Sequence, residues 1–269
     1  MTLLQIIVLA LVQGITEFLP ISSSGHLILV PELTSWPDQG IMMDVGVHVG
    51  TLGAVMLYFR QDVGRMIHAF IQMITFKKEY NKMERHLMLA LILSTIPIVI
   101  IGGLASKMGL TDIWRTIEII GWASIVFGIF LYWFDKHSKT NLILANLSFS
   151  HALIIGIAQI FAIIPGTSRS GVTMTAARAL GFTRTDAARF SMLMSIPTIL
   201  AAAILQIKDL LDTTSLTIGT DLLLGAGLSF VSALLAIAGL LKWLEKSSMT
   251  PFVIYRVLLG VGLLMMVYS

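Results

Sequence analysis

The fold is decided by Leu19-Pro20-Ile21-Ser22-Ser23-Ser24-Gly25-His26 and by Ile164-Pro165-Gly166-Thr167-Ser168-Arg169-Ser170-Gly171, two polar breaks in otherwise apolar sequence. They divide the apolar stretches of about 3 to 30 and about 150 to 181, and each resulting half is too short to span a bilayer. Irregular backbone at membrane depth is tolerated only where it is buried in protein or lines a watery cavity. We therefore predict two re-entrant hairpins, each made of two short helices joined by a polar turn.

The composition around these breaks is that of an integral membrane protein. Of the 269 residues, 56% are hydrophobic and only 12% are charged, whereas soluble domains carry about 25% charged residues. A soluble protein needs more polar surface than this, which excludes an ordinary cytosolic enzyme. The absence of cysteine excludes disulfides, thiolate catalysis and cysteine-based metal sites. In a membrane protein a net charge of +3 reflects basic residues in the cytoplasmic loops and does not indicate a nucleic-acid partner. We expect membrane lipids as partners and no nucleic acid.

Six further apolar runs of near 20 residues predict six transmembrane helices. They cover about 41 to 59, 87 to 105, 116 to 134, 187 to 206, 222 to 241 and 252 to 268. The expected fold is an all-α integral membrane protein with six transmembrane helices and two re-entrant hairpins. We expect a single membrane domain over residues 1–269.

The two broken stretches resemble each other. A shift of 146 residues aligns Gln13 with Gln159, Ser22 with Ser168, Ser24 with Ser170 and Gly25 with Gly171. This indicates two halves, about 1–135 and 150–269, each a hairpin followed by three spans. Because three is odd, the second hairpin should enter from the opposite side of the membrane. The prediction is an inverted-topology repeat whose two polar turns meet near the midplane.

Basic residues indicate the orientation. With both termini outside, thirteen of the eighteen lysines and arginines fall in inner loops and three in outer loops. The inner ones are Arg60, Arg65, Lys77, Lys78, Lys82, Arg85, Lys136, Lys139, Arg178, Arg184, Arg189, Lys242 and Lys246; the outer ones are Lys107, Arg115 and Lys208. The positive-inside rule therefore places both termini outside and the loop 60–86 in the cytoplasm. Because no basic residue precedes Arg60, we expect no signal peptide and a first segment that stays in the mature protein.

Polar side chains of the first break form one candidate site. Ionisable groups at membrane depth are costly and are functional candidates by default, although pairing for structure is the alternative. Gln13 and Glu17 are four residues apart, on one face of the first half-helix. Ser22 and Ser23 are N-cap candidates for the second half-helix, and His26 lies in its first turn.

The second break reads as an anion site. Thr167, Ser168, Arg169, Ser170 and Gly171 open a helix, so that free N–H groups, hydroxyls and a guanidinium lie together, and phosphate fits such a site best. A divalent cation at Glu17 beside this phosphate is physically sensible, because Mg2+ binds through one or two carboxylates plus substrate phosphates.

Two other polar pairs lie within predicted spans. Asp44 and His48, four residues apart, either line the same cavity or bond neighbouring helices. Tyr255 and Arg256, in the last span, are more often a structural pair.

The sequence resembles the bacterial undecaprenyl-diphosphate phosphatase family, known also for bacitracin resistance. The resemblance runs along the whole chain and is carried by four stretches. These are Gln13-Gly14-Ile15-Thr16-Glu17-Phe18-Leu19-Pro20-Ile21-Ser22-Ser23-Ser24-Gly25-His26, Asp44-Val45-Gly46-Val47-His48-Val49-Gly50-Thr51-Leu52, Pro165-Gly166-Thr167-Ser168-Arg169-Ser170-Gly171 and Tyr255-Arg256.

The resemblance implies a metal-assisted phosphatase that removes the terminal phosphate of a C55 polyprenyl diphosphate at the outer face of the bacterial inner membrane. It implies that Glu17 is catalytic or bound to the divalent cation, Mg2+ or Ca2+. By the same resemblance Ser23 is the nucleophile with Ser22 as the alternative, His26 is an acid/base partner, and Arg169 clamps the diphosphate with Ser168 and Ser170. The substrate-binding set expected from this and from the breaks also includes Gln13, Ser24, Thr167, Gly171, Asp44 and His48. The family has Glu or Gln at the position of Gln13; with Gln here one carboxylate is absent, which argues against a two-carboxylate metal site.

Two other activities compete with this interpretation. Broken helices that meet at the midplane are also typical of secondary transporters and lipid flippases. Ser23-Ser24-Gly25-His26 is similar to part of the pattern of lipid phosphatases with a histidine nucleophile, but these need a histidine after their Ser-Arg pair, and the last histidine here is His151. The sequence leaves the oligomeric state open, including a homodimer.

Overall fold

The computed structural model describes residues 1–34, 36–75, 81–213 and 219–269. Within these ranges the chain forms helices, and its one β-type pairing is an isolated bridge between Leu142 and Phe182. Six of the described helices are long and apolar enough to cross a membrane. They are α3 (Gly40–Tyr58), α5 (Lys82–Lys107), α7 (Ile117–His137), α10 (Arg184–Thr213), α11 (Thr220–Leu244) and α12 (Thr250–Tyr268). The predicted all-α class and the six spans are confirmed.

The two broken stretches form pairs of short helices. The first pair is α1 (Leu3–Thr16) and α2 (Ser23–Thr34), and the second is α8 (Phe149–Gln159), extended by the 3-10 turn η2 (Ile160–Ile163), and α9 (Arg169–Ala179). These lengths agree with hairpins that do not span a bilayer of about 30 Å. Their depth, their direction of entry and the inverted repeat stay predictions, as does the division into two halves.

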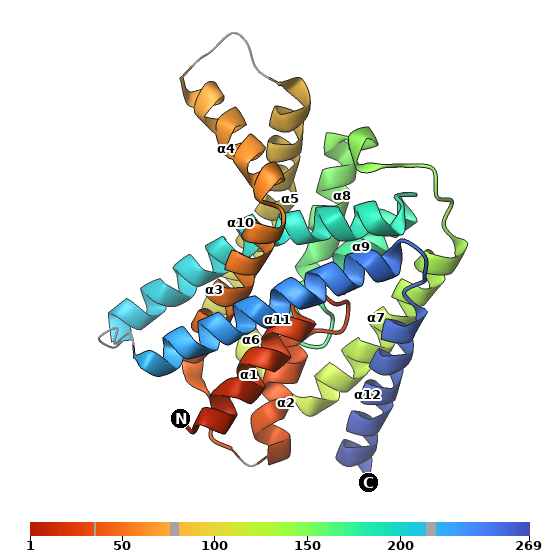
Figure 1. Cartoon of the computed structure of the whole chain (residues 1–269). Helices are drawn as coiled ribbons and strands as arrows, with labels where there is room; N and C mark the ends of the chain where they lie inside the picture. The colour runs from red at the N-terminus through yellow and green to blue at the C-terminus, as the bar shows by residue number, and fades with distance from the viewer. Residues whose placement is uncertain (35, 76–80, 214–218) are drawn as a thin grey trace.

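Glycine brings each hairpin close to a spanning helix. A Cβ atom on Gly14 of α1 would lie 1.9 Å from Ser232 Oγ of α11, and one on Gly156 of α8 would lie 2.4 Å from the carbonyl oxygen of Ser94 on α5. Any larger side chain would push these helices apart. Figure 1 shows the resulting arrangement, in which α1 lies along α11.

A helix occupies much of the segment that we predicted as the loop 60–86. Helix α4 covers Arg60–Ile74 and packs against α5 (Figure 1). Its apolar residues follow a helical spacing that could have identified it, namely Val63, Met66, Ile67, Phe70 and Ile71. The predicted inner residues Lys77 and Lys78 lie outside the described residues, and so does the side chain of the predicted outer residue Lys208. The remaining elements are the short α6 (Leu110–Ile113) and η1 (Leu144–Asn146).

Ion pairs lie at both ends of the helix bundle. Arg115 pairs with Asp38 at 3.7 Å, and the N-terminal amine pairs with Asp221 at 3.5 Å, at the end that we predicted to be outside. Arg189 pairs with Asp62, and Arg184 with Asp135, at the other end. Both termini lie at the end of the molecule opposite α4 (Figure 1). Which end faces the cytoplasm stays a prediction from the basic residues.

Candidate active site

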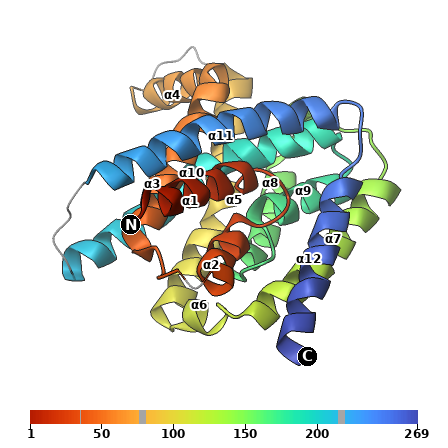
Figure 2. The same ribbon diagram turned by 60° about the horizontal axis from the view of Figure 1, so that its bottom comes forward.

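The two polar turns lie against each other, between α1 and α2 and between η2 and α9 (Figure 2). The Gly166 amide donates to Ser22 Oγ at 3.2 Å, and the Ser170 hydroxyl donates to the carbonyl oxygen of Leu19 at 2.8 Å. These bonds join residues more than 140 positions apart, so the two turns are in contact; their place at the membrane midplane stays a prediction.

The carboxylate of Glu17 is at the centre of this site. Glu17 follows the last residue of α1 and is buried. Its Oε2 accepts hydrogen bonds from Gln13 Nε2 at 2.9 Å and from Ser23 Oγ at 2.7 Å, and its Oε1 lies 3.3 Å from Arg169 Nη2. The predicted common face of Gln13 and Glu17 is therefore confirmed. One carboxylate gathers an amide, a hydroxyl and a guanidinium.

The neighbouring serines have different partners. Ser23 is the first residue of α2, and its hydroxyl points at Glu17. The oxygen of Ser22 accepts from the amides of Gly25 and Gly166, at 3.3 and 3.2 Å, so it caps α2 and joins the turns. The exposed hydroxyl of Ser24 lies 3.4 Å from that of Ser22. Only the hydroxyl of Ser23 among these three is bonded to a carboxylate.

His26 is held by two groups and does not bond to Ser23. Its Nδ1 lies 2.7 Å from the carbonyl oxygen of Ser22, which can only accept, so Nδ1 carries the hydrogen. Its Nε2 then accepts from the hydroxyl of Tyr255 at 2.5 Å, and the two rings are stacked with centroids 5.6 Å apart. The pairing with Tyr255 was not predicted, because 229 residues separate the two positions.

The second turn presents Arg169 at the start of α9. Ser168 is the N-cap of this helix, and its Oγ accepts from the Gly171 amide at 3.1 Å and lies 3.2 Å from Ser170 Oγ. The Gly171 amide, which we expected to be free for phosphate, is therefore already bonded. Arg169 Nη1 donates to the carbonyl oxygen of Ser191, whereas Arg169 Nε and Thr167 Oγ1 are buried without a hydrogen-bond partner in the described structure.

Asp44 and His48 occupy different positions relative to the site. His48 Nε2 lies 3.7 Å from Glu17 Oε2, and its Nδ1 bonds to the carbonyl oxygen of Asp44. The carboxylate of Asp44 accepts instead from Gln39 Nε2 at 2.8 Å. His48 thus borders the site, while the Asp44 side chain bonds to a neighbouring residue at the start of α3.

Arg256 is the functional candidate that we placed among structural residues. It projects from α12, is fully buried, and reaches the backbone of both turns. Its position directly after Tyr255 in the last span is the one signal that could have identified it.

The protein groups do not fit a resident divalent cation. Among the described residues, no three His, Asp or Glu side chains lie close enough to hold a metal ion. Glu17 is the one carboxylate at the turns, and the guanidinium of Arg169 already lies 3.3 Å from it. A cation at Glu17 would therefore need further ligands from outside the protein.

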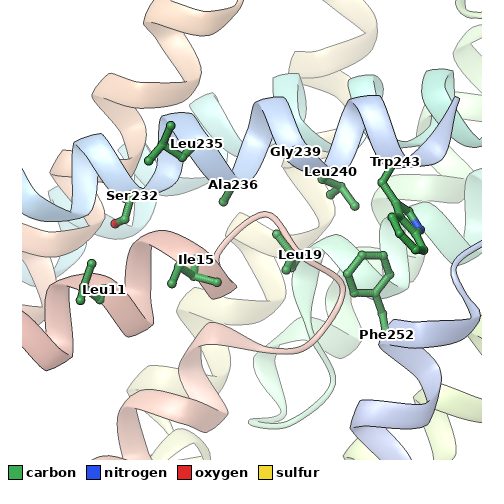
Figure 3. A pocket seen from close by; sticks show the side chains of 10 residues that line it. All are labelled: Leu11, Ile15, Leu19, Ser232, Leu235, Ala236, Gly239, Leu240, Trp243 and Phe252. Carbon is green, nitrogen blue, oxygen red and sulfur yellow. The ribbon is translucent and has the colours of Figure 1, made fainter.

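An apolar groove of about 440 Å³ lies between α1, α11 and α12 (Figure 3). It is lined by Leu11, Ile15, Leu19, Ser232, Leu235, Ala236, Gly239, Leu240, Trp243 and Phe252. Leu11 and Ile15 are exposed, whereas Gln13 and Glu17 on the other face of α1 are buried. With no ionisable side chain, this groove is not the phosphate site.

Comparison with known proteins gives matches along nearly the whole chain. A family model described as bacitracin resistance protein BacA matches residues 6–262. The chain is 47% identical over 269 residues to a protein of Ruegeria pomeroyi named undecaprenyl-diphosphatase, and covers 100% of both chains. Proteins of the same name from Magnetococcus marinus and Alteromonas mediterranea are 50% identical over 97% of each chain and 48% identical over 100% of each chain. The chain that carries these two joined turns belongs to the bacitracin resistance protein BacA family.

Proposed function

We propose that this protein hydrolyses undecaprenyl diphosphate to undecaprenyl phosphate and inorganic phosphate. The contact of the Ser23 hydroxyl with Glu17 Oε2 at 2.7 Å carries the proposal, together with the guanidinium of Arg169 at the other carboxylate oxygen. One buried carboxylate, which can act as the base, thus has a nucleophile at one oxygen and a cation for phosphate oxygens at the other. The names of the relatives support this activity.

In the proposed reaction the Ser23 oxygen attacks the terminal phosphorus while Glu17 accepts the hydroxyl proton. The bond from that phosphorus to the bridging oxygen breaks, and undecaprenyl phosphate leaves with the bonding electrons and takes up the proton from Glu17. Water then attacks the phosphoserine and gives a proton to Glu17, which returns it to the departing serine oxygen. Direct attack by water, with Glu17 or His26 as the base, is the competing mechanism. For His26 to act as an acid or base, its Nε2 would have to give up the hydrogen bond with the Tyr255 hydroxyl and form one with the substrate or with water.

The second turn supports diphosphate binding. The buried Arg169 Nε and Thr167 Oγ1 have no partner among the described residues, and unpaired buried donors are costly in the absence of a ligand. Phosphate oxygens would satisfy both groups at the N-terminus of α9, where the helix dipole favours an anion. The hydroxyls of Ser168 and Ser170 lie in the same turn.

We propose that the divalent cation, Mg2+ or Ca2+, enters with the diphosphate. Glu17 would contribute the protein oxygen, and the cation would offset the charge of the phosphates. The reaction steps above use only groups of this chain and water.

The setting of the reaction belongs to the same proposal. The enzyme would lie in the bacterial inner membrane with its site reached from the outer side, where it would recycle the lipid carrier for cell-wall synthesis. A larger pool of recycled carrier would raise resistance to bacitracin, in agreement with the description of the family.

Phosphate release by purified protein tests the proposal. Detergent-solubilised protein is incubated with undecaprenyl diphosphate, with and without EDTA, and inorganic phosphate is measured. We expect release without any ion gradient, and loss in EDTA supports the cation. A transporter or flippase would release no phosphate, and this result would refute the proposed function. Glu245→Gln, an exposed carboxylate at the predicted inner end, is the control that should keep wild-type activity.

A further inference from the structure

The guanidinium of Arg256 connects three parts of the fold through backbone carbonyl groups. Nη1 donates to the carbonyl oxygen of Pro20 in the first turn at 3.3 Å, and Nη2 donates to those of Gly166 and Thr167 in the second turn at 3.0 and 2.8 Å. Nε and Nη2 also reach the carbonyl oxygens of Ser124 and Ala123 on α7, at 3.2 and 3.4 Å. No carboxylate of the described residues forms an ion pair with Arg256.

Three of these carbonyl groups, those of Pro20, Gly166 and Thr167, lie in the turns outside any helix, whereas those of Ala123 and Ser124 lie within α7. Buried backbone acceptors without a partner are costly, so the turn carbonyls need a donor. Water could serve them at a surface, but Arg256 is fully buried and fills this place with five N–H groups in one plane. Lysine has three donors at a single point and cannot reach both turns and α7 together.

Gly171 makes room for this arrangement. A Cβ atom on Gly171, in the first turn of α9, would lie 2.7 Å from Arg256 Nη1. The guanidinium therefore lies directly against the helix that carries Arg169. An alanine at position 171 would press most closely on the guanidinium and keep its charge, and its Cβ would also lie 3.0 Å from Ser168 Cβ.

We propose that Arg256 is a positioning residue that fixes the two turns relative to each other, so that Arg169 faces Glu17 and Ser23. This inference rests on the proposed phosphatase activity. Ser23 and Glu17 belong to the first turn and Arg169 to the second, so their alignment depends on contacts between the turns. Arg256 itself touches neither substrate nor nucleophile in this role.

The test measures catalysis and geometry in Arg256→Lys and Gly171→Ala. Because the chain has no cysteine, spin labels can be placed at Ile15→Cys and Phe161→Cys, exposed residues close to the two turns, for pulsed-EPR distance measurement. Misplacement of catalytic groups by about 1 Å can cost about 100-fold in rate, so we expect a comparable fall in kcat with KM within about threefold. The label-to-label distance distribution should broaden in both variants. Arg115→Lys, at the outer surface, is the matched control that should change neither quantity.

The outcomes separate this inference from the proposed function. If wild-type protein releases no phosphate, the proposed function fails. If wild type is active and Gly171→Ala or folded Arg256→Lys keeps its kcat, Arg256 is not a positioning residue. The same conclusion follows if kcat falls while the distance distribution stays as in wild type. A lower Tm with normal kcat in the folded fraction would indicate a purely structural role.

Discussion

Ser22 and Ser168 share a left-handed backbone conformation, with φ of 76° and 70°, and each oxygen accepts from the amide of the glycine three residues later. This conformation costs a non-glycine residue about 1–2 kcal/mol, which the capping bonds offset. The next residue begins a helix in both turns, and it is Ser23 in one and Arg169 in the other. Both of these side chains contact Glu17. The same backbone device thus directs a hydroxyl and a guanidinium at one carboxylate.

Ser23→Ala should abolish phosphoenzyme formation, because its hydroxyl is the one bonded to Glu17. Ser22→Ala should instead lower thermal stability, since it loses the bonds to the Gly25 and Gly166 amides. The measurement is acid-stable label on the protein after incubation with terminally labelled substrate. Full activity in Ser23→Ala with loss in Ser22→Ala would move the role by one residue. Loss in neither variant would favour attack by water.

Glu17→Gln should lower the turnover rate at least about 100-fold, the lower range for a lost acid/base group. Glutamine keeps the size of the side chain and can still bond to Ser23, but it cannot accept a proton. Phosphate release under saturating substrate measures the effect, with Glu245→Gln as the matched substitution at an exposed site. Near-normal turnover by folded Glu17→Gln would end its assignment as the base.

Arg169→Lys should lower kcat/KM about 10- to 150-fold, which corresponds to one charge-assisted contact of about 1.5–3 kcal/mol. Lysine keeps the charge but loses the planar fork that holds two oxygens, and Arg169→Ala should cost more. Steady-state kinetics with undecaprenyl diphosphate measures both variants.

The alternative is that Arg169 only pairs with Glu17 and so holds the two hairpins together, and the 3.3 Å contact agrees with this as well. On that alternative Arg169→Lys keeps much of the activity, and Arg169→Ala chiefly lowers Tm. Activity of Arg169→Lys within about twofold of wild type, a difference of about 0.4 kcal/mol, would refute the clamp.

Cysteine labelling should place Lys78 in the cytoplasm and Asp38 outside. The expectation follows from the thirteen-to-three excess of basic residues on one face. An impermeant thiol reagent added to intact cells should modify Asp38→Cys and leave Lys78→Cys unmodified until the cells are opened. Labelling of Lys78→Cys in intact cells would invert the orientation.

Local patterns predicted the parts of the site that neighbouring residues build. Gln13 and Glu17 were placed on one helical face by their spacing, and Ser22 was identified as a cap candidate by the first polar break. The most consequential contacts that escaped prediction join distant parts of the chain. Tyr255 reaches His26 from the last span, and nothing in the sequence near either residue indicates that these helices meet.

Arg256 was noted in the last span as a structural residue, but its contacts with the two turns were missed for a related reason. Its partners are backbone carbonyl groups, which every residue has, so no side-chain pattern marks them. Helix α4 was not predicted for another reason. It is amphipathic, so it contains no long apolar run of the kind that indicates a transmembrane helix.

Arg256 also ties the site to the order in which the chain is synthesised. The ribosome delivers both turns well before α12, because N-terminal parts emerge first. The carbonyl groups of Pro20, Gly166 and Thr167 therefore gain this guanidinium only when α12 enters the bilayer. On the proposed role of Arg256, a nascent chain already holds its reactive side chains but lacks the contact that aligns them. Synthesis and insertion of α12 would then be the event that activates the enzyme, and chains truncated before α12 would release no phosphate from the lipid substrate.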